Sequence, residues 1–237
     1  MVRLRRRSTP APAPVAPAAV ENRPHFHRDL DALEEQMRDM ADSARRSLEL
    51  SLRALAASDP AQAGSVIEGD DDIDRRCQEI ERRAIDLMGR QQPVASDLRL
   101  LVALLHVSLH LERIGDMAVN VGEATRTAAS LPPIPEILHH LEEMGGAAAS
   151  MTELAVEAFT RRDRGMCERL PEIDDRIDQL DREMISHVLA YRDDPERLEW
   201  ALRMLPVSRS LERAADHAVD IAEQAWFVMT GELRELD

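Results

Sequence analysis

The distribution of apolar residues along the chain predicts an all-helical protein. Apolar residues recur at spacings of three and four rather than alternating, which is the period of an amphipathic helix and not of a strand. One such stripe comprises Leu101, Leu104, Leu105, Leu111, Gly115 and Ala118. At ~1.5 Å per residue, a helix of about 30 residues would be roughly 45 Å long. Six long helices are expected, over residues 26–57, 60–91, 94–130, 135–162, 165–192 and 195–231.

Turn-forming residues mark where these helices begin and end. Asp59 and Pro60 are suited to the N-cap and the first position of a helix, and "DDP" at 193–195 repeats this arrangement. The segment "LPPIP" at 131–135 is the strongest helix breaker and lies at the midpoint of the chain. Pro206 falls inside the last predicted helix and is expected to kink it.

One stretch of sequence occurs twice. "SLHLERIGDMAVNVGE" at 108–123 and "SRSLERAADHAVDIAE" at 208–223 share half of their sixteen positions. Earlier in each half the offset is 104 residues, and "DDDID" at 70–74 matches "DDRID" at 174–178. An internal repeat of this kind predicts two copies of one supersecondary unit. The expected fold is therefore all-α, with two tandem three-helix bundles.

The repeat divides the chain into two bundles preceded by a tail. Residues 1–24 carry an arginine cluster and alternating Ala and Pro, which cannot build a core, so a disordered tail is expected there. The first three-helix repeat is predicted over 25–131 and the second over 132–237. Each set of three helices is expected to close around its own core, with the proline-rich joint linking the two cores.

Composition narrows the classes of function. The chain of 237 residues has a formal net charge of −15, which argues against nucleic acid as a partner and is compatible with cations or basic protein surfaces. No apolar run approaches about 18 residues, so no direct membrane insertion is expected, and no apolar signal region is evident. Cys77 and Cys167 form no CxxC motif, which favours free thiols in a reducing compartment.

Acidic residues recur at helical spacing and suggest a metal site. Glu112 and Asp116 are four residues apart, so they lie on one helix face, at the border of the apolar stripe. Carboxylates at the edge of a core repel one another unless a cation lies among them. Oxygen ligands favour Mg²⁺, Mn²⁺ or iron. The alternative is a solvated acidic row paired with Arg113 or Arg213. The candidate ligands are Asp70, Asp74, Glu112, Asp116 and Asn120 in the first half and Asp174, Asp178, Glu212, Asp216 and Asp220 in the second.

The histidines add less to this prediction. His106 and His110 are four residues apart, as in a ligand pair, but they lie far around the helix from the acid pair. His217 follows an acid of the second row and could support a ligand from outside the site. His139 and His140 flank the midpoint and are expected on the surface.

Four motifs in order resemble the PhoU family. They are "VIEGDDDID" at 66–74, "MGRQQPVASDLRLL" at 88–101, "LERIGDMAVNV" at 111–121 and "LERAADHAVDIAE" at 211–223. The resemblance covers about residues 25–231. It implies two tandem three-helix bundles and the role of a cytoplasmic bacterial regulator of phosphate uptake. The tail has no counterpart in the core of the family.

The resemblance also implies partners and ligands. Members of the family act with the phosphate ABC transporter, through its ATPase subunit, and with the phosphate-sensing histidine kinase. They repress the phosphate-starvation response when phosphate is plentiful, so the protein would lie in the cytoplasm, at the inner face of the membrane when bound to the transporter. A homodimer is compatible with the sequence.

The family's E/D-x-x-x-D motifs bind metal, in some members as iron or zinc clusters. Carried over to this chain, the motif residues are Asp70 and Asp74, Glu112 and Asp116, Asp174 and Asp178, and Glu212 and Asp216. The next turn holds Asn120 in one half and Asp220 in the other, so the two sites are expected to differ in affinity. The metal could be Mg, Mn, Fe or Zn.

Two other classes of protein are alternatives to a metal-binding regulator. A ferritin-like di-metal oxidase needs two Glu-x-x-His motifs, and the chain offers one, Glu136 with His139. A metal-independent helical adaptor would have the same fold. Gly145–Gly146 lacks the Lys-Ser/Thr of a phosphate loop, and no Ser/His/Asp set can be argued, so no enzyme activity is expected.

Overall fold

A computed structural model describes residues 24–236 and confirms the all-α prediction. Its helices are α1 (Pro24–Ala56), α2 (Pro60–Gln91), α3 (Ala95–Ala128), α4 (Pro135–Arg161), α5 (Arg164–Cys167), α6 (Leu170–Leu189) and α7 (Pro195–Thr230). The predicted tail at 1–24 lies outside the described residues except for Pro24, at which α1 begins. No helix of residues 24–236 has the length and apolar character needed to cross a membrane.

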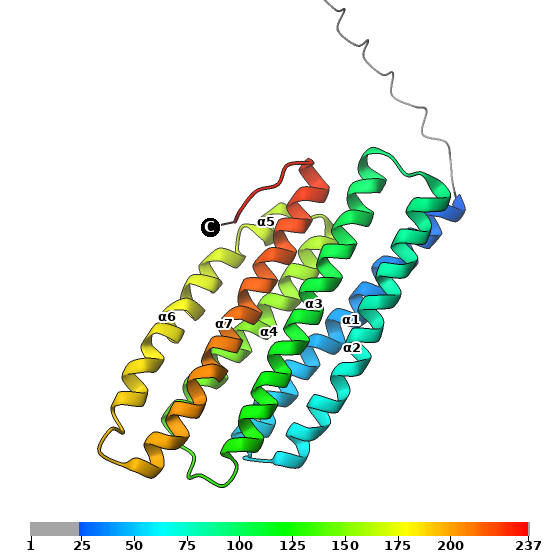
Figure 1. Ribbon diagram of the computed structural model, residues 1–237. Helices are drawn as coiled ribbons and strands as arrows, with labels where there is room; N and C mark the ends of the chain where they lie inside the picture. The colour runs from blue at the N-terminus through cyan, green and yellow to red at the C-terminus, as the bar shows by residue number, and fades with distance from the viewer. Residues whose placement is uncertain (1–23, 237) are drawn as a thin grey trace, which may run out of the picture.

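The helices form two groups that meet along their length (Figure 1). α1, α2 and α3 pack on one another, and α7 packs against both α4 and α6. The most extensive contact of all joins α3 to α7, which run antiparallel through the middle of the molecule, and α1 also packs on α4. The two repeats are therefore joined by helix packing over a broad interface.

The hydrophobic core is continuous across both repeats, so the expectation of two separate cores is wrong. Buried side chains of all seven helices belong to one cluster, which includes Phe26, Leu111, Phe159 and Trp200. The reason lies in the central helices. Along α3, residues 101, 103, 104 and 107 are all buried, so more than one face of this helix is covered. A helix that is apolar around most of its circumference must be surrounded by other helices.

The backbone repeats the sequence symmetry at the first turn of each half. Ser58 and Arg162, which are 104 residues apart, both adopt positive φ angles, of 49° and 56°. Each precedes an aspartate that caps the next helix. Asp59 accepts hydrogen bonds from the first amides of α2, and Asp163 does so for α5. As predicted, Asp194 likewise caps α7, with Pro195 in its first turn.

The fifth predicted helix, 165–192, is divided into α5 and α6, which corrects the sequence prediction. Pro171 lies in the first turn of α6 and has no amide hydrogen to donate to the carbonyl of Cys167, the last residue of α5. The first repeat has Ile67 at the equivalent position, and α2 runs through it without interruption. Pro206, in contrast, lies within α7, which continues on both sides of it.

Two adjacent glycines in α4 offer a test of the packing between repeats. A Cβ atom added to Gly145 would lie 2.9 Å from Cδ2 and 3.0 Å from Cγ of Leu52 on α1, whereas one added to Gly146 meets nothing within 4 Å. We expect Gly146→Ala to stabilise the protein by about 0.5–1 kcal/mol, because glycine is costly inside a helix. Gly145→Ala should instead destabilise it by about 1–3 kcal/mol through overpacking. Urea denaturation measures both, and an equal gain for the two variants would contradict the close α1–α4 contact.

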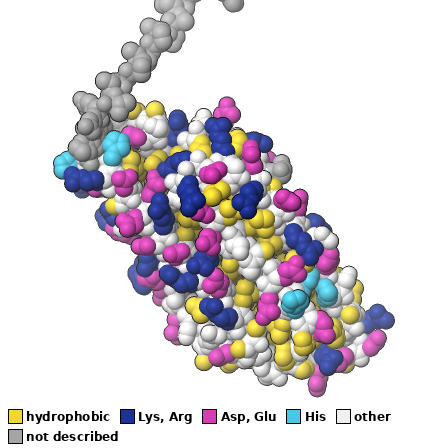
Figure 2. All heavy atoms as spheres, turned by 180° about the vertical axis from the view of Figure 1, so that it is seen from behind, with side chains coloured by type: hydrophobic (Ala, Val, Ile, Leu, Met, Phe, Trp, Pro, Cys, Tyr) yellow, Lys and Arg dark blue, Asp and Glu magenta, His cyan; other side chains and the backbone are white. Residues whose placement is uncertain are grey.

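Charged side chains cover the outside of the bundle. Figure 2 shows basic and acidic side chains intermixed over one face, with hydrophobic side chains visible between them. The two cysteines are free, as predicted. Burial raises the pKa of Cys167 to about 11, so its thiol stays protonated near neutral pH.

Candidate metal centres

The first predicted acid cluster is brought together by α2 and α3. Asp70 and Asp74 lie on α2, and Glu112 and Asp116 lie on α3. Burial raises the pKa of Asp70 to about 6, and the charges of Asp74, Asp116 and Glu112 add to this shift. Four carboxylates predicted from spacing alone therefore share one electrostatic environment. We refer to these four residues as the first acid cluster.

The carboxylate of Asp70 packs closely against α3 at Gly115. A Cβ atom at Gly115 would lie only 2.8 Å from Oδ1 of Asp70, so the absence of a side chain at Gly115 makes room for this carboxylate against α3. Oδ1 of Asp70 and Oε2 of Glu112 are both buried, and neither has a hydrogen-bond partner. Burial, followed by the charge of Asp116, raises the pKa of Glu112.

The second acid cluster repeats the first between α6 and α7. It comprises Asp174, Asp178, Glu212 and Asp216. Burial raises the pKa of Asp174 to about 7, with Asp216, Asp178 and Glu212 contributing in that order. Oε2 of Glu212 is buried without a hydrogen-bond partner, whereas Asp216 is exposed. Ala215 stands where the first repeat has a glycine, so the two clusters are not identical.

Arginines neutralise part of each cluster. Arg113 pairs with Asp116 at 2.8 Å and with Glu112 at 3.3 Å, as the alternative interpretation expected. In the second repeat the arginine that pairs with Glu212 is Arg209, at 3.1 Å, rather than Arg213. Asp178 pairs with Arg182 at 3.0 Å.

The acid clusters are spread more widely than a closed ligand set. Within residues 24–236, their carboxylate oxygens do not approach one another in threes within 4.8 Å. Like charges repel, and the arginine pairs draw several of the carboxylates outward. Even so, three buried carboxylate oxygens accept no hydrogen bond, although one of them, Oε2 of Glu112, lies 3.3 Å from Nε of Arg113. Carboxylate oxygens are the donors that hard cations take. The residues of both clusters therefore fit a hard cation.

Asn120 and Asp220, the remaining predicted ligands, also make contacts outside the two clusters. Asn120 is exposed, and its amide lies 3.9 Å from the sulfur of Met117. It borders a cavity between α3 and α7 that Ser210 and Arg213 also line. Asp220 lies beside His110 of α3 and His217 of its own helix, α7. Burial raises the pKa of Asp216 and the charge of Asp220 adds to this, so Asp220 still acts on its acid row as well as on the histidines.

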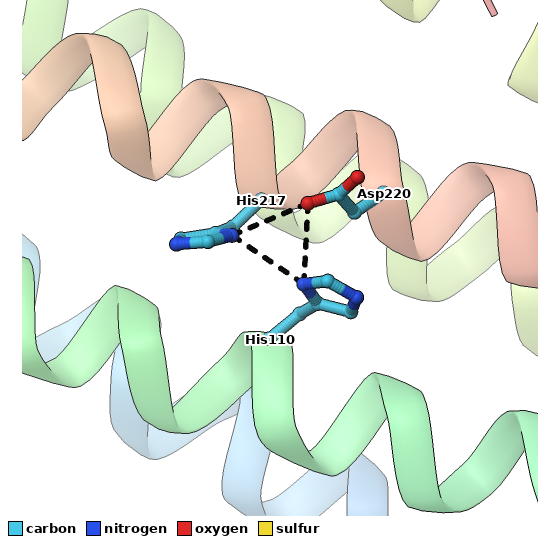
Figure 3. Close-up of side chains that lie close together, drawn as sticks. All are labelled: His110, His217 and Asp220. Carbon is cyan, nitrogen blue, oxygen red and sulfur yellow. Dashed lines mark hydrogen bonds and ion pairs between the residues drawn. The ribbon is translucent and has the colours of Figure 1, made fainter. Parts of the chain in front are cut away.

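Asp220 belongs to a third cluster, which we call the seam cluster because it spans the α3–α7 interface (Figure 3). Nδ1 of His110 lies 3.2 Å from Oδ2 of Asp220, Nδ1 of His217 lies 3.3 Å from the same oxygen, and the two Nδ1 atoms are 3.4 Å apart. Both histidines are about one-fifth exposed. The prediction missed this cluster because His110 and His217 are 107 residues apart.

Protonation in the seam cluster follows from its surroundings. Burial lowers the pKa of His110, and the neighbouring His217 adds to this, despite the charge of Asp220. Burial opposes ionisation of Asp220, but the hydrogen bond from His217 and the charge of His110 outweigh it and lower the pKa of this carboxyl. A neutral imidazole and an ionised carboxylate are favoured as a result.

A second histidine cluster lies between α4 and α6. One ligand atom each of His140, Glu183 and His187 lies within 4.8 Å of the others. His140 was expected on the surface, but it is buried, and its Nε2 lies 2.8 Å from the carbonyl oxygen of Leu180. The packing of α6 over α4 buries it, which the local sequence does not reveal.

Comparison with known families and proteins gives a consistent result over most of the chain. The model of the PhoU domain matches residues 37–125 and again 141–225, one match in each half. A "Phosphate-specific transport system accessory protein PhoU homolog" of Caulobacter vibrioides (strain NA1000 / CB15N) is 34% identical, covering 76% of this chain and 79% of the relative. The "PhoU homolog 1" of Thermotoga maritima is 31% identical over 87% of this chain and 90% of the relative.

Two solved structures are similar in fold along their whole length. PhoU from Pseudomonas aeruginosa superposes with a TM-score of 0.83 at 27% identity, covering 87% of this chain and all of that one. The phosphate transport system regulatory protein PhoU from Streptococcus pneumoniae gives a TM-score of 0.82 at 26% identity, covering 89% of this chain and all of that one.

Proposed function

The chain belongs to the PhoU family, and on that premise we propose that it is an accessory regulator of phosphate transport rather than an enzyme. The observation that carries the proposal is the similarity to proteins named as phosphate transport accessory proteins over most of the chain, in both repeats. The proposed action is repression of the phosphate-starvation response when phosphate is abundant. The protein would act in the cytoplasm, at the inner face of the membrane while it is bound to the transporter.

The proposed partners are the ATPase subunit of the phosphate ABC transporter and the phosphate-sensing histidine kinase. Long helices with charged outer faces are suited to docking on other proteins. A net charge of −15 favours partners with basic surfaces. Self-association as a homodimer is part of the same proposal.

The two acid clusters are proposed to hold hard cations, either Mg²⁺, Mn²⁺ or iron. Asp70, Asp74, Glu112 and Asp116 would hold one, and the equivalent residues of the second repeat would hold another. A bound cation would neutralise carboxylates that otherwise repel, fix α2 on α3 and α6 on α7, and change the charge that these faces present to a partner.

The proposal is tested by secreted phosphatase activity in phosphate-rich medium after deletion of the gene. We expect activity to rise several-fold and to return to the low level when the intact gene is restored, because the repressor of the response has been removed and replaced. Activity that stays low in the deletion strain would contradict the proposed repression.

Complementation with variants then reports on the acid clusters. A gene carrying Asp116→Ala and Asp216→Ala should fail to restore repression if bound cations matter for docking. The control carries Asp72→Ala, since Asp72 lies on the same helix as the first cluster but pairs with Arg75 and Arg76.

A metal-independent adaptor is the second candidate function. The arginine pairs of Asp116, Asp178 and Glu212 favour it, because they already neutralise part of the acidic charge. In that case the variant with both cluster substitutions would restore repression as well as the intact gene does.

A further inference from the structure

We propose that His110, His217 and Asp220 form a Zn²⁺ site that links the two repeats across the α3–α7 interface. The site uses different residues and different ligand chemistry from the acid clusters, which it adjoins through Asp216 and Glu112. It also does not depend on the proposed role in phosphate transport.

The geometry of the seam cluster matches one face of a zinc coordination tetrahedron. A tetrahedral zinc ion with bonds of about 2.0–2.1 Å places neighbouring ligand atoms about 3.3–3.4 Å apart. The three separations among the two Nδ1 atoms and Oδ2 of Asp220 are 3.2, 3.3 and 3.4 Å. All three atoms point toward a common centre (Figure 3). A cation at this centre requires no rearrangement of the helices.

Hydrogen bonds alone cannot satisfy this triangle of atoms. A neutral imidazole carries at most one proton on Nδ1, and an ionised carboxylate carries none. If both histidines are protonated at Nδ1, each can donate to Asp220, but the two N–H groups then face each other. If only one is protonated, the lone pair on the other Nδ1 faces a lone pair of Asp220 at 3.2 or 3.3 Å. A central cation accepts all three lone pairs at once.

The ligand types favour zinc over Mg²⁺, one of the cations proposed for the acid clusters. Two imidazole nitrogens and one carboxylate oxygen are the donor set of open zinc sites, in which water fills the fourth position. Asp220 is 42% exposed, so water can reach the site. Mg²⁺ requires a nearly octahedral set of oxygen ligands, which this cluster does not offer.

The internal repeat of the chain shows that the ligand set occurs at one of two equivalent places on the α3–α7 interface. With the 100-residue offset, the counterparts of His110, His217 and Asp220 are Ser210, Met117 and Asn120. These counterparts lie seven or ten residues from the seam cluster along α3 and along α7. Asn120 and Ser210 line one cavity between α3 and α7, and the amide of Asn120 lies 3.9 Å from the sulfur of Met117. The fold therefore accepts Ser, Met and Asn at these three positions, and only one of the two equivalent places carries the zinc ligand set.

The test measures zinc affinity of the full chain after metal has been removed with a chelator. To exclude binding by the acid clusters, the reference protein carries Asp70→Asn and Asp174→Asn. Competition against a chromophoric chelator should reveal one tight Zn²⁺ per chain that excess Mg²⁺ does not displace. Replacement of zinc by Co²⁺ should give the strong visible absorption of a tetrahedral ion, whereas a weak octahedral spectrum would overturn the proposal.

The variants that test the site replace each proposed ligand by the residue at the equivalent position of the other repeat. We expect His110→Ser, His217→Met and Asp220→Asn each to weaken zinc binding more than about 100-fold, because even partners outside the ligand set are worth about 10–100-fold. His106→Asn, one turn from His110 and exposed, is the matched control and should bind as before.

Three further results would overturn the proposal. The first is tight binding that survives His217→Met. The second is binding that is lost with His187→Gln instead, which would place the ion at the α4–α6 cluster. Absence of any tight zinc would leave the three residues as a hydrogen-bonded contact and would equally overturn it.

Discussion

Replacing Asp174 with asparagine is expected to stabilise the metal-free protein at pH 8 by about 1–3 kcal/mol. The pKa of this carboxyl is raised to about 7 in the folded protein, against 3.8 for an ordinary aspartate. One pKa unit corresponds to about 1.4 kcal/mol, so the shift bounds the effect at roughly 4 kcal/mol, and solvent near a half-buried group reduces it. Asparagine removes the charge and keeps the shape.

The gain from Asp174→Asn should depend on pH in a defined direction. Because the folded-state pKa lies above the unfolded-state value, the folded protein holds this proton more tightly. The stability that the proton contributes is complete below about pH 4 and is lost as the pH rises to about 7. The advantage of the variant should therefore be close to zero near pH 4 and largest above pH 7.

Urea denaturation in the presence of EDTA, at pH 4, 6 and 8, measures this dependence. Asp175→Asn is the matched control, because Asp175 is the exposed neighbour on the same helix. Its effect should stay within about 0.5 kcal/mol at each pH. If Asp174→Asn does not increase the free energy of unfolding, or if the increase does not change with pH, the ionised carboxylate of Asp174 does not destabilise the folded protein.

Addition of Mn²⁺ is expected to reverse the order of stability between the wild type and the acid-cluster variants. At a free concentration about 100 times the dissociation constant, one bound ion stabilises a folded protein by about 2.7 kcal/mol. For a chain of this size that corresponds to a rise in Tm of about 5–10 °C. The protein with Asp70→Asn and Asp174→Asn should lose most of this rise.

The comparison has a control that separates the two kinds of metal site. His217→Met alters the seam cluster and leaves the eight acid-cluster carboxylates in place, so it should keep the response to Mn²⁺. EDTA should return the wild type to its lower Tm. An equal rise in the wild type and in the acid-cluster variant would place the cation elsewhere and would support the metal-independent adaptor.

Much of the local structure follows from the sequence because its causes are local. The spacing of apolar residues predicts helices, and Asp59 with Pro60 marks the start of one. The repeated "DDDID" and "DDRID" motifs place acid pairs at equivalent positions in both halves. Each of these signals acts within a few residues along the chain. The break at Pro171 is also local, and the sequence prediction missed it by treating 165–192 as one segment.

The sequence by itself determined the helices, their caps, the internal repeat and the acid pairs. The tertiary structure alone decided how these helices meet. Packing of α3 on α7 merged the two expected cores into one and brought Asp220 to a histidine of the other repeat. The same packing brought His110 to His217, a contact that helical periodicity cannot predict. Periodicity fixes which residues share a face of one helix, whereas the partner of that face depends on how whole helices bury their apolar surface.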